Sequence, residues 1–370
     1  MEYNQTHTWR EINETPEIFT KILEKNATVL AELVQTIKDS GKTNFVAAAR
    51  GSSNNALVFF KYMLEFMTDY TVGFSAPSIL TLYKGKISYA NSIIIGCSQS
   101  GRAEDVLEVI KKGNEQNAIT IAVTNDENSP IAKNAKYHLN LCAGEEQSFV
   151  ATKTFNAEMF LLLWLATELA GARENRKLLS HLSIDLEHVI PQIDDLTSTY
   201  AEKFKDMRDG FVLARGLTYP IALESSLILQ ETCRIPVKGY AGSEFYHGPM
   251  AMVNENTPII IYCARFDGDE EVQSIIRADQ MKLIKKMLSL NAPVLLVTND
   301  CVLTGKFKNC NDALLYFSLP EKISAFAFAV FAQMLACKIS CLKGLNPDNP
   351  ANMENKNSAS KKPSFLLNKF

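Results

Sequence analysis

The sequence has no large excess of charge of either sign and no segment typical of a membrane or secreted protein. Its 38 Lys and Arg against 41 Asp and Glu leave a net charge of −3, which argues against electrostatic binding of nucleic acid. The first 14 residues are polar and charged, unlike a secretory signal. The most apolar run, near residues 160–166, is much shorter than a bilayer span. We therefore expect a cytoplasmic protein without a nucleic-acid or membrane partner.

Cysteine is too sparse and too irregularly spaced for a disulfide framework. Eight cysteines are spread over 370 residues, and none forms a Cys-x-x-Cys pair. Cys337 and Cys341 are four residues apart on a predicted helix, but no histidine or further cysteine is close in sequence, which favours core packing over metal binding. No Gly-x-Gly-x-x-Gly or Walker pattern follows an apolar run. The sequence therefore predicts no metal and no nucleotide cofactor.

The first half of the chain alternates short runs rich in Val and Ile with amphipathic segments. Predicted strands are 44–49, 71–75, 91–97, 118–124 and 137–141, and predicted helices are 16–40, 54–68, 103–114, 130–134 and 153–170. Near-continuous apolar strands between helices indicate a parallel sheet covered on both faces. The pattern thus predicts a doubly wound α/β fold.

The second half restarts the same pattern after a charged segment near 175–205, which fits a connecting helix. Strands are predicted at 210–214, 258–262, 294–297 and 313–317, and helices at 219–233, 271–288 and 323–342. Arg215-Gly216 follows its strand as Arg50-Gly51 follows the first, which indicates a weak internal duplication. We predict an N-terminal segment (1–26), two α/β domains (27–172 and 195–342) and an irregular tail (343–370).

Two hydroxyl-rich turns follow predicted strands in the first half. Ser98-Gln99-Ser100-Gly101 comes after the apolar run 92–97, and Gly51-Ser52-Ser53-Asn54 comes after 44–49. Ligands in doubly wound sheets bind at the carboxyl ends of strands, and a helix start offers free N–H groups to a phosphate. The turns therefore predict a phosphorylated small molecule held from two sides. Helix capping by the serines is the alternative, and the two roles are compatible.

Six short motifs follow one another along the chain. They are Ala-Arg-Gly-Ser-Ser-Asn (49–54), Ser-Gln-Ser-Gly (98–101), Ala-Val-Thr-Asn (122–125), Val-Ala-Thr-Lys-Thr-Phe (150–155), Tyr-Pro-Ile-Ala-Leu-Glu (219–224) and Glu-Phe-Tyr-His-Gly-Pro (244–249). In this order they resemble the double sugar-isomerase (SIS) domain family. The resemblance implies two tandem doubly wound SIS domains, each a mostly parallel sheet flanked by helices. Similar in kind are the isomerase half of glucosamine-6-phosphate synthase and the stand-alone amino-sugar phosphate deaminases and sugar-amine phosphate deglycases.

The synthase also carries an N-terminal glutaminase domain that begins with a catalytic cysteine. This chain begins Met1-Glu2-Tyr3 and reaches its first SIS motif by Arg50. We therefore expect no glutaminase domain and no ammonia drawn from glutamine, which favours the deaminase or deglycase direction over a synthase.

The resemblance implies where the sugar phosphate binds. Positions that match the family's phosphate site or its immediate neighbours are Ser52, Ser53, Ser98, Gln99 and Ser100. Gly51 and the backbone of Val150 and Ala151 are expected to line the sugar. Lys153 is either a ligand residue or an exposed residue at a helix start paired with Glu146, and we favour the structural role.

The resemblance also implies three catalytic residues. Glu231 matches the family's catalytic glutamate, which moves a proton between C1 and C2, although Glu224 and Glu231 share a helix face that could simply be solvent-exposed. His247 matches the histidine that opens the sugar ring in the neighbouring subunit, so a homodimer with shared active sites is expected. Lys356 is one place from the family's C-terminal lysine and is a candidate for imine formation or carbonyl polarisation, or else an exposed tail residue.

Ile228 departs from the synthase, which has a lysine at this position. An apolar neighbour is expected to raise the pKa of Glu231 and change the chemistry in detail. The leading hypothesis is a cofactor-free enzyme that acts on an amino-sugar phosphate, similar to glucosamine-6-phosphate deaminase, or on a sugar-amine 6-phosphate. The alternatives are a plain phosphosugar isomerase and a sensor that binds a sugar phosphate without turnover.

Overall fold

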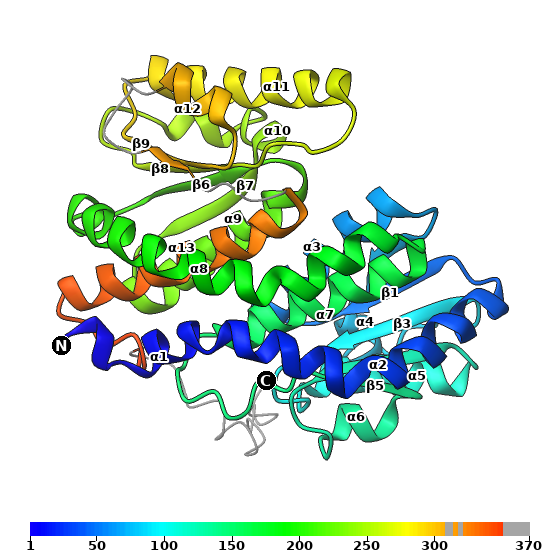
Figure 1. Ribbon diagram of the computed structural model, residues 1–370. Helices are drawn as coiled ribbons and strands as arrows, with labels where there is room; N and C mark the ends of the chain where they lie inside the picture. The colour runs from blue at the N-terminus through cyan, green and yellow to red at the C-terminus, as the bar shows by residue number, and fades with distance from the viewer. Residues whose placement is uncertain (308–313, 317–320, 351–370) are drawn as a thin grey trace.

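The computed structural model describes residues 1–307, 314–316 and 321–350 and contains two parallel sheets flanked by helices (Figure 1). The elements of the first half are η1 (Tyr3–Gln5), α1 (His7–Asn13), α2 (Thr15–Ser40), β1 (Asn44–Ala48), α3 (Gly51–Met67), β2 (Thr71–Phe74), α4 (Pro77–Thr81), β3 (Ser92–Cys97), α5 (Glu104–Glu115), β4 (Ile119–Thr124), α6 (Pro130–Asn134), β5 (Tyr137–Asn140) and α7 (Lys153–Ala170). Those of the second half are α8 (Arg173–Phe204), β6 (Gly210–Ala214), η2 (Gly216–Thr218), α9 (Tyr219–Cys233), β7 (Val237–Ala241), α10 (Gly242–Phe245), η3 (Pro249–Met252), β8 (Ile259–Cys263), α11 (Glu270–Ser289), β9 (Val294–Thr298), α12 (Cys301–Phe307), β10 (Leu314–Tyr316) and α13 (Glu321–Leu342).

The two sheets have the same strand order, which confirms the predicted doubly wound fold. The first runs β2-β1-β3-β4-β5 and the second β7-β6-β8-β9-β10, with parallel pairing throughout the described strands. Every residue of β4, β6, β8 and β9 is buried. These central strands are covered on both faces, and this is why they read as continuous apolar runs rather than alternating ones.

The edge strand β7 is the main element that the apolar pattern does not predict. Its five residues include the exposed Lys238 and the conformationally permissive Gly239. A Cβ at Gly239 would lie 2.6 Å from the carbonyl oxygen of Ala222 in α9. Glycine is therefore required because the backbone of α9 lies directly against the strand. The short helix α4 is also missed by the pattern.

The predicted duplication is visible in side-chain contacts as well as in strand order. Arg50 follows β1 and pairs with Asp105 of α5 at 2.6 Å, and Arg215 follows β6 and pairs with Asp279 of α11 at 3.0 Å. Both β4 and β9 end in Val-Thr and continue into Asn-Asp. The two halves thus use corresponding residues at corresponding strand ends.

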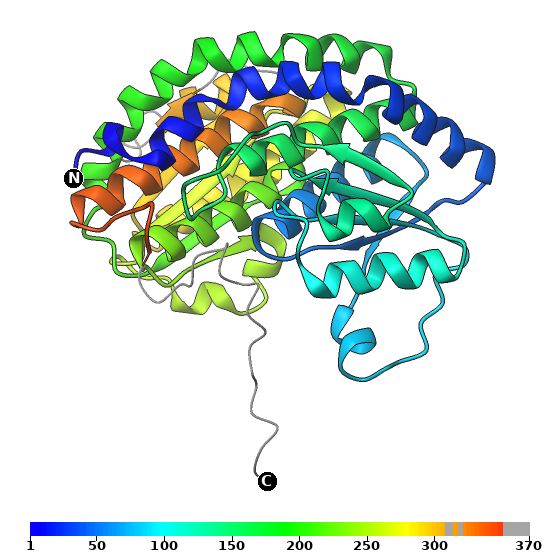
Figure 2. The same cartoon turned by 90° about the horizontal axis from the view of Figure 1, so that it is seen from below.

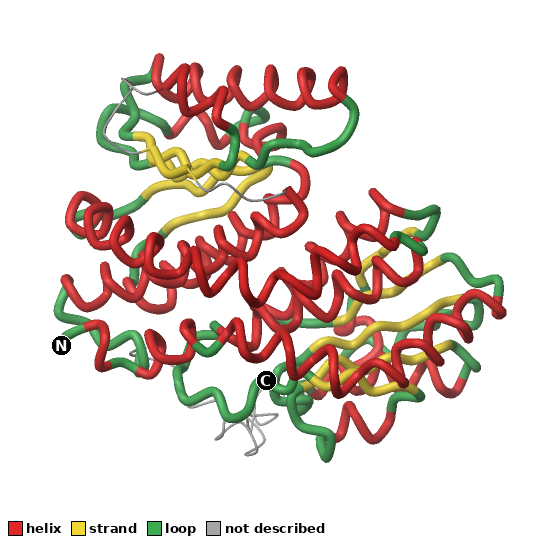
Figure 3. Tube along the Cα trace, viewed as in Figure 1, coloured by secondary structure: helices red, strands yellow, loops and turns green. Residues whose placement is uncertain are grey.

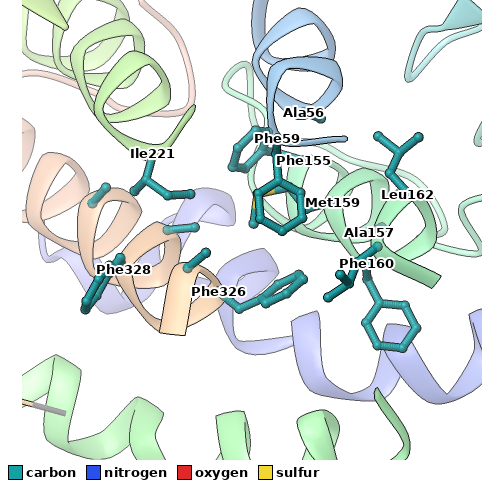
Figure 4. Close-up of a cluster of buried hydrophobic side chains, with 14 of the residues drawn as sticks. Ala56, Phe59, Phe155, Ala157, Met159, Phe160, Leu162, Ile221, Phe326 and Phe328 are labelled. Atoms are coloured by element: carbon teal, nitrogen blue, oxygen red, sulfur yellow. The ribbon is translucent and has the colours of Figure 1, made fainter. Parts of the chain in front are cut away.

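A buried cluster joins the two halves into one core. Figure 4 shows Phe59 of α3, Phe155 and Met159 of α7, Ile221 of α9 and Phe326 of α13 converging between the helices. Figure 3 shows the same helices as the layer that separates the two sheets. Because α9 packs against α3 in this layer, side chains of the second half reach the carboxyl edge of the first sheet.

Long helices cover this layer on its outer side. The predicted connecting helix is confirmed as α8, which runs along α2 and α13 (Figure 2). Among the described residues, only Ile323–Leu342 of α13 is long and apolar enough to cross a membrane by length and composition, and 89% of that stretch is buried inside the protein. Its apolar character therefore serves the core.

Candidate functional site

The Ser-Gln-Ser-Gly turn lies between the end of β3 and the start of α5. The Ser98 N–H donates to the Val123 carbonyl at 3.1 Å, and the Gly101 N–H donates to the Ser98 carbonyl at 3.0 Å and to its Oγ at 3.2 Å. Gly101 has a φ of 63°, and a Cβ there would lie 2.0 Å from Oγ of Ser129. The turn therefore requires glycine, both for its backbone conformation and for its contact with the start of α6.

The serines of this turn are not the cap of the following helix. The N-cap of α5 is Ala103, which makes no side-chain cap bond. The Ser98 and Ser100 oxygens accept from the N–H groups of Gly101 and Arg102 within the turn. Within the described part of the chain neither hydroxyl hydrogen has an acceptor, so both can donate to an anion. Capping of α5 does not explain these serines.

The second hydroxyl turn is itself the beginning of a helix. The sequence pattern predicts a helix from 54, but α3 begins at Gly51, whose φ is 55°. Ser52 and Ser53 therefore occupy the first helical turn, where backbone N–H groups have no partner within the helix. The N-cap residue, Arg50, makes no side-chain cap bond to α3. This 17-residue helix thus presents N–H groups and the positive end of its dipole at the edge of the sheet.

The sheet brings the two turns together. β1 and β3 are adjacent and parallel, with Ala48 opposite Gly96. The chain leaves both strands at the same edge, so Ser52 and Ser53 lie near Ser98 and Ser100 by construction of the fold. The two turns thus follow adjacent strands at one sheet edge, and the phosphate that we expect them to hold from two sides stays a prediction.

Beneath the first turn of α3 lies a buried carboxyl group that the sequence analysis does not identify. The Ser53 hydroxyl donates to Oε1 of Glu158, in α7, at 2.7 Å. The Glu158 side chain is 1% exposed. It also hydrogen-bonds the Cys97 thiol. The pKa of Cys97 is raised well above its usual range, mainly by burial and secondly by the nearby Glu158 carboxyl group. The Ser53 hydroxyl therefore points into the protein, so its predicted phosphate contact would come from its N–H group.

A second buried carboxyl group reaches the same helical turn from the other half of the chain. Oε2 of Glu224, in α9, accepts from the side-chain amide of Asn55 at 2.9 Å, and Ser52 also hydrogen-bonds this carboxyl group. Glu224 is 1% exposed, so the solvent-exposed alternative is wrong for this residue. Burial raises its pKa from 4.5 to about 8, against the opposing effect of these hydrogen bonds. In the described residues its Oε1 has no hydrogen-bond partner. A protonated acid with a free oxygen thus lies beside the candidate phosphate site.

Glu231 lies two turns beyond Glu224 on α9 and is half-buried. Its charge is one of the causes that raise the pKa of Glu224, so the two carboxyl groups interact. Ile228, between them, is buried as an apolar neighbour should be, and its expected effect on Glu231 stays a prediction.

No contact among the described residues places His247 at this edge. His247 lies in an exposed turn after α10, where its N–H donates to the Glu244 carbonyl at 3.0 Å. Among the described residues its imidazole makes no hydrogen bond or ion pair. Lys356 lies outside the described residues. A role for His247 in a neighbouring subunit is compatible with its exposure and stays a prediction.

The start of α7 differs from the sequence expectation at Lys153. This residue is 4% exposed rather than solvent-facing, and its Nζ pairs with Glu14 at 2.7 Å, not with Glu146. Glu146 instead accepts from the N–H groups of Thr152 and Thr154. This ion pair is compatible with the structural role that we favour for Lys153, which stays a prediction. The expected exposure and the expected Glu146 partner are both wrong, because α1 and α2 fold over this helix start. Val150 and Ala151 are buried next to it, and their contact with a sugar stays a prediction.

A metal centre has no visible basis in the described residues. No group of three His, Cys, Asp or Glu side chains is close enough together to hold an ion in residues 1–307, 314–316 and 321–350. Cys337 is buried and contacts Thr6 at 3.5 Å, which agrees with a packing role. The site therefore offers hydroxyls, helix N–H groups and carboxyl groups.

Among curated proteins the chain is similar to glutamine–fructose-6-phosphate aminotransferase (isomerizing) from two distant sources. It is 26% identical over 349 residues to the protein of Sulfolobus acidocaldarius and 27% identical over 358 residues to that of Streptococcus pneumoniae. The matches cover 93% of this chain but only 55% and 57% of those relatives. The chain therefore spans about half the length of the curated relatives it matches.

Solved structures match the fold over nearly the whole chain. The C-terminal domain of glucosamine-fructose-6-phosphate aminotransferase from Francisella tularensis superposes with a TM-score of 0.80 at 22% identity, covering 94% of this chain and all of that one. Glucosamine-6-phosphate deaminase from Thermotoga maritima gives 0.70 at 24% identity, covering 95% and 99%. Tagatose-6-phosphate ketose/aldose isomerase from Escherichia coli gives 0.78 at 15% identity, covering 94% and 96%.

A family model described as SIS domain matches residues 39–168 and 203–341, one segment for each sheet. These matches agree with the equal strand orders and with the motifs at the sheet edge. The chain belongs to the SIS domain family and carries two such domains in tandem.

Proposed function

We propose that the chain binds a sugar phosphate at the edge of its first sheet and acts on an amino-sugar phosphate or a sugar-amine 6-phosphate. The observation that carries this proposal is the meeting of two hydroxyl turns after adjacent strands β1 and β3. The Ser98 and Ser100 hydroxyls and the N–H groups that begin α3 supply donors to a phosphate from two directions. No protein cation is needed for such a site.

The carboxyl groups of α9 would supply the proton chemistry. Isomerisation moves a proton between C1 and C2 of the open sugar, and deamination or deglycation releases an amine from the same carbons. Glu231 is our candidate for the acid and base, because it lies on the helix that reaches this edge. Glu224, two turns away on the same helix and with its pKa of about 8, would hold a proton near neutral pH. His247 would open the ring from a partner subunit, which makes a homodimer part of the proposal.

The relatives support the substrate class without defining it. The names of the curated relatives and of two structural neighbours contain fructose-6-phosphate or glucosamine-6-phosphate. A third neighbour is a ketose/aldose isomerase for tagatose 6-phosphate. A plain phosphosugar isomerase is therefore the second candidate, and it differs from the first in releasing no nitrogen.

The deciding experiment measures ammonia or amine release and ketose–aldose interconversion over a panel of glucosamine, fructosamine and fructose 6-phosphates. The proposal expects turnover with nitrogen release, lost in Glu231→Gln and weakened in affinity in Ser98→Ala/Ser100→Ala. Interconversion without nitrogen release would favour the plain isomerase. Thermal stabilisation by a sugar phosphate without turnover would favour a sensor. If the chain showed no stabilisation and no turnover with any member of the panel, all three functions would be refuted.

A further inference from the structure

Glu158 occupies a place that none of the expected site residues explains. It comes from the middle of α7, in the apolar stretch that packs against α3, and is 1% exposed. A carboxyl group in such surroundings is costly unless its oxygens are hydrogen-bonded. Two of its hydrogen-bond partners belong to the elements beside the candidate phosphate site, the start of α3 and the end of β3.

The first partner is Ser53, whose hydroxyl donates to Glu158 Oε1 at 2.7 Å. Ser53 lies in the first turn of α3, whose N–H groups face the sheet edge. The second partner is Cys97, the last residue of β3, whose thiol hydrogen-bonds the same carboxyl group. Ser98 follows directly. One side chain is thus hydrogen-bonded to a residue of the first hydroxyl turn and to the residue that directly precedes the second.

We propose that Glu158 is a positioning residue that ties the turn after β1 to the turn after β3 and so sets the affinity for the ligand's phosphate group. This inference rests on the proposed function, because it names a determinant of that same site. By accepting from Ser53, Glu158 turns that hydroxyl inward. The phosphate then meets the N–H groups of α3 and the hydroxyls of Ser98 and Ser100 at a fixed spacing.

The choice of substitution separates hydrogen bonding from charge. Glu158→Gln keeps an oxygen that accepts from Ser53 and has the same shape, and it removes any negative charge behind the anion site. We expect its affinity for phosphate to equal or exceed that of the unaltered chain. Glu158→Leu keeps the volume but accepts no hydrogen bond, so the bonds to Ser53 and Cys97 are both lost. We expect it to weaken binding by about tenfold or more, with a smaller change in kcat than in KM.

The experiment titrates inorganic phosphate and fructose 6-phosphate against the full chain by calorimetry, for Glu158→Gln, Glu158→Leu, Ser53→Ala and Ser53→Ala/Glu158→Leu. If the bond is the cause, the double variant binds no more than about twofold more weakly than either single variant. Thr167→Val is the matched control: it alters a buried hydroxyl of the same helix that has no partner among the described residues, and should leave binding unchanged.

Three results would overturn the inference. Equal binding by Glu158→Leu and the unaltered chain would show that the tie is irrelevant, and a loss in Glu158→Gln as large as in Glu158→Leu would show that the acceptor is not what matters. Effects of Ser53→Ala and Glu158→Leu that multiply would show independent roles. If Glu158→Leu does not fold, Ser53→Ala and Ser53→Ala/Glu158→Gln supply the same comparison. If the unaltered chain binds neither probe, the proposed function fails and the inference falls with it, whereas all other failures concern Glu158 alone.

Discussion

Replacing Glu224 with glutamine should change how the stability of the fold depends on pH. Burial raises the pKa of this carboxyl group from 4.5 to about 8. Between these values the folded chain keeps the proton and the unfolded chain has lost it. The folded state therefore binds more protons at this group, and the contribution of Glu224 to the free energy of unfolding falls as pH rises. The contribution is complete below about pH 4.5 and is lost progressively up to the folded pKa.

The size of the effect follows from the two pKa values. One pKa unit corresponds to about 1.4 kcal/mol, so a rise from 4.5 to about 8 corresponds to about 5 kcal/mol in all. Between pH 5.5 and pH 8.5 the linkage relation gives a loss of about 3 kcal/mol from this one group. Glutamine does not ionise, and its oxygen still accepts from Asn55. Glu224→Gln should therefore remove this loss.

The assay is urea unfolding of the unaltered chain and Glu224→Gln at several pH values, with Glu24→Gln on the exposed face of α2 as the control. The difference in unfolding free energy between Glu224→Gln and the unaltered chain should grow by about 3 kcal/mol from pH 5.5 to pH 8.5. The control should show no such trend. A constant difference across this range would refute the argument that Glu224 is neutral in the folded protein at pH 7.

Three further predictions concern the supports around the site. Gly101→Ala should destabilise the chain by about 1–3 kcal/mol and weaken phosphate binding, because the new Cβ would lie 2.0 Å from Ser129 Oγ. The control Gly144→Ala has a similar φ of 64° and nothing within 4 Å of the new Cβ, so it should cost less. Equal urea midpoints for the two variants would contradict this. Asp348→Ala should lower the free energy of unfolding in urea by about 1–2 kcal/mol. The Asp348 carboxylate accepts from the N–H groups of His7 and Thr8 at 2.8 Å each and so anchors the chain after α13 to α1. An unchanged urea midpoint would show that this anchor is weak. Lys153→Met should lower the free energy of unfolding by about 3–5 kcal/mol, because it leaves the buried Glu11 without its neighbouring cation at 3.8 Å. Lys21→Met removes an exposed ion pair and should lower it by less than about 1 kcal/mol.

The position of α9 suggests why both halves of the chain are present in one protein. Glu224 belongs to the second half but bonds to Asn55, in the first half. A movement of one half relative to the other would break this contact at the start of α3. The start of α3 and the carboxyl groups of α9 are therefore held in one arrangement by the shared core around Phe59 and Ile221.

Local pattern in the sequence was sufficient for the fold class and for the positions of the two hydroxyl turns along the chain. Runs of Val and Ile identify β3, β4 and β8 because buried parallel strands are apolar on both faces. The position of Ser98 to Gly101 directly after such a run predicts a turn at the sheet edge, because parallel strands end at the same edge. The edge strand β7 escaped this reasoning, because only the contact of Gly239 with α9 explains its glycine.

The tertiary structure alone decided what lies behind those turns. Ser53 and Glu158 are 105 residues apart in sequence, and Asn55 and Glu224 are 169 apart. Periodicity reports only which face of a helix is buried, not which polar group of a distant helix meets it. Glu158 therefore reads as an isolated charge in an apolar run, and Glu224 as a candidate for a solvated face. Packing of α7 and α9 against α3 turns both into buried hydrogen-bonded carboxyl groups at the candidate site.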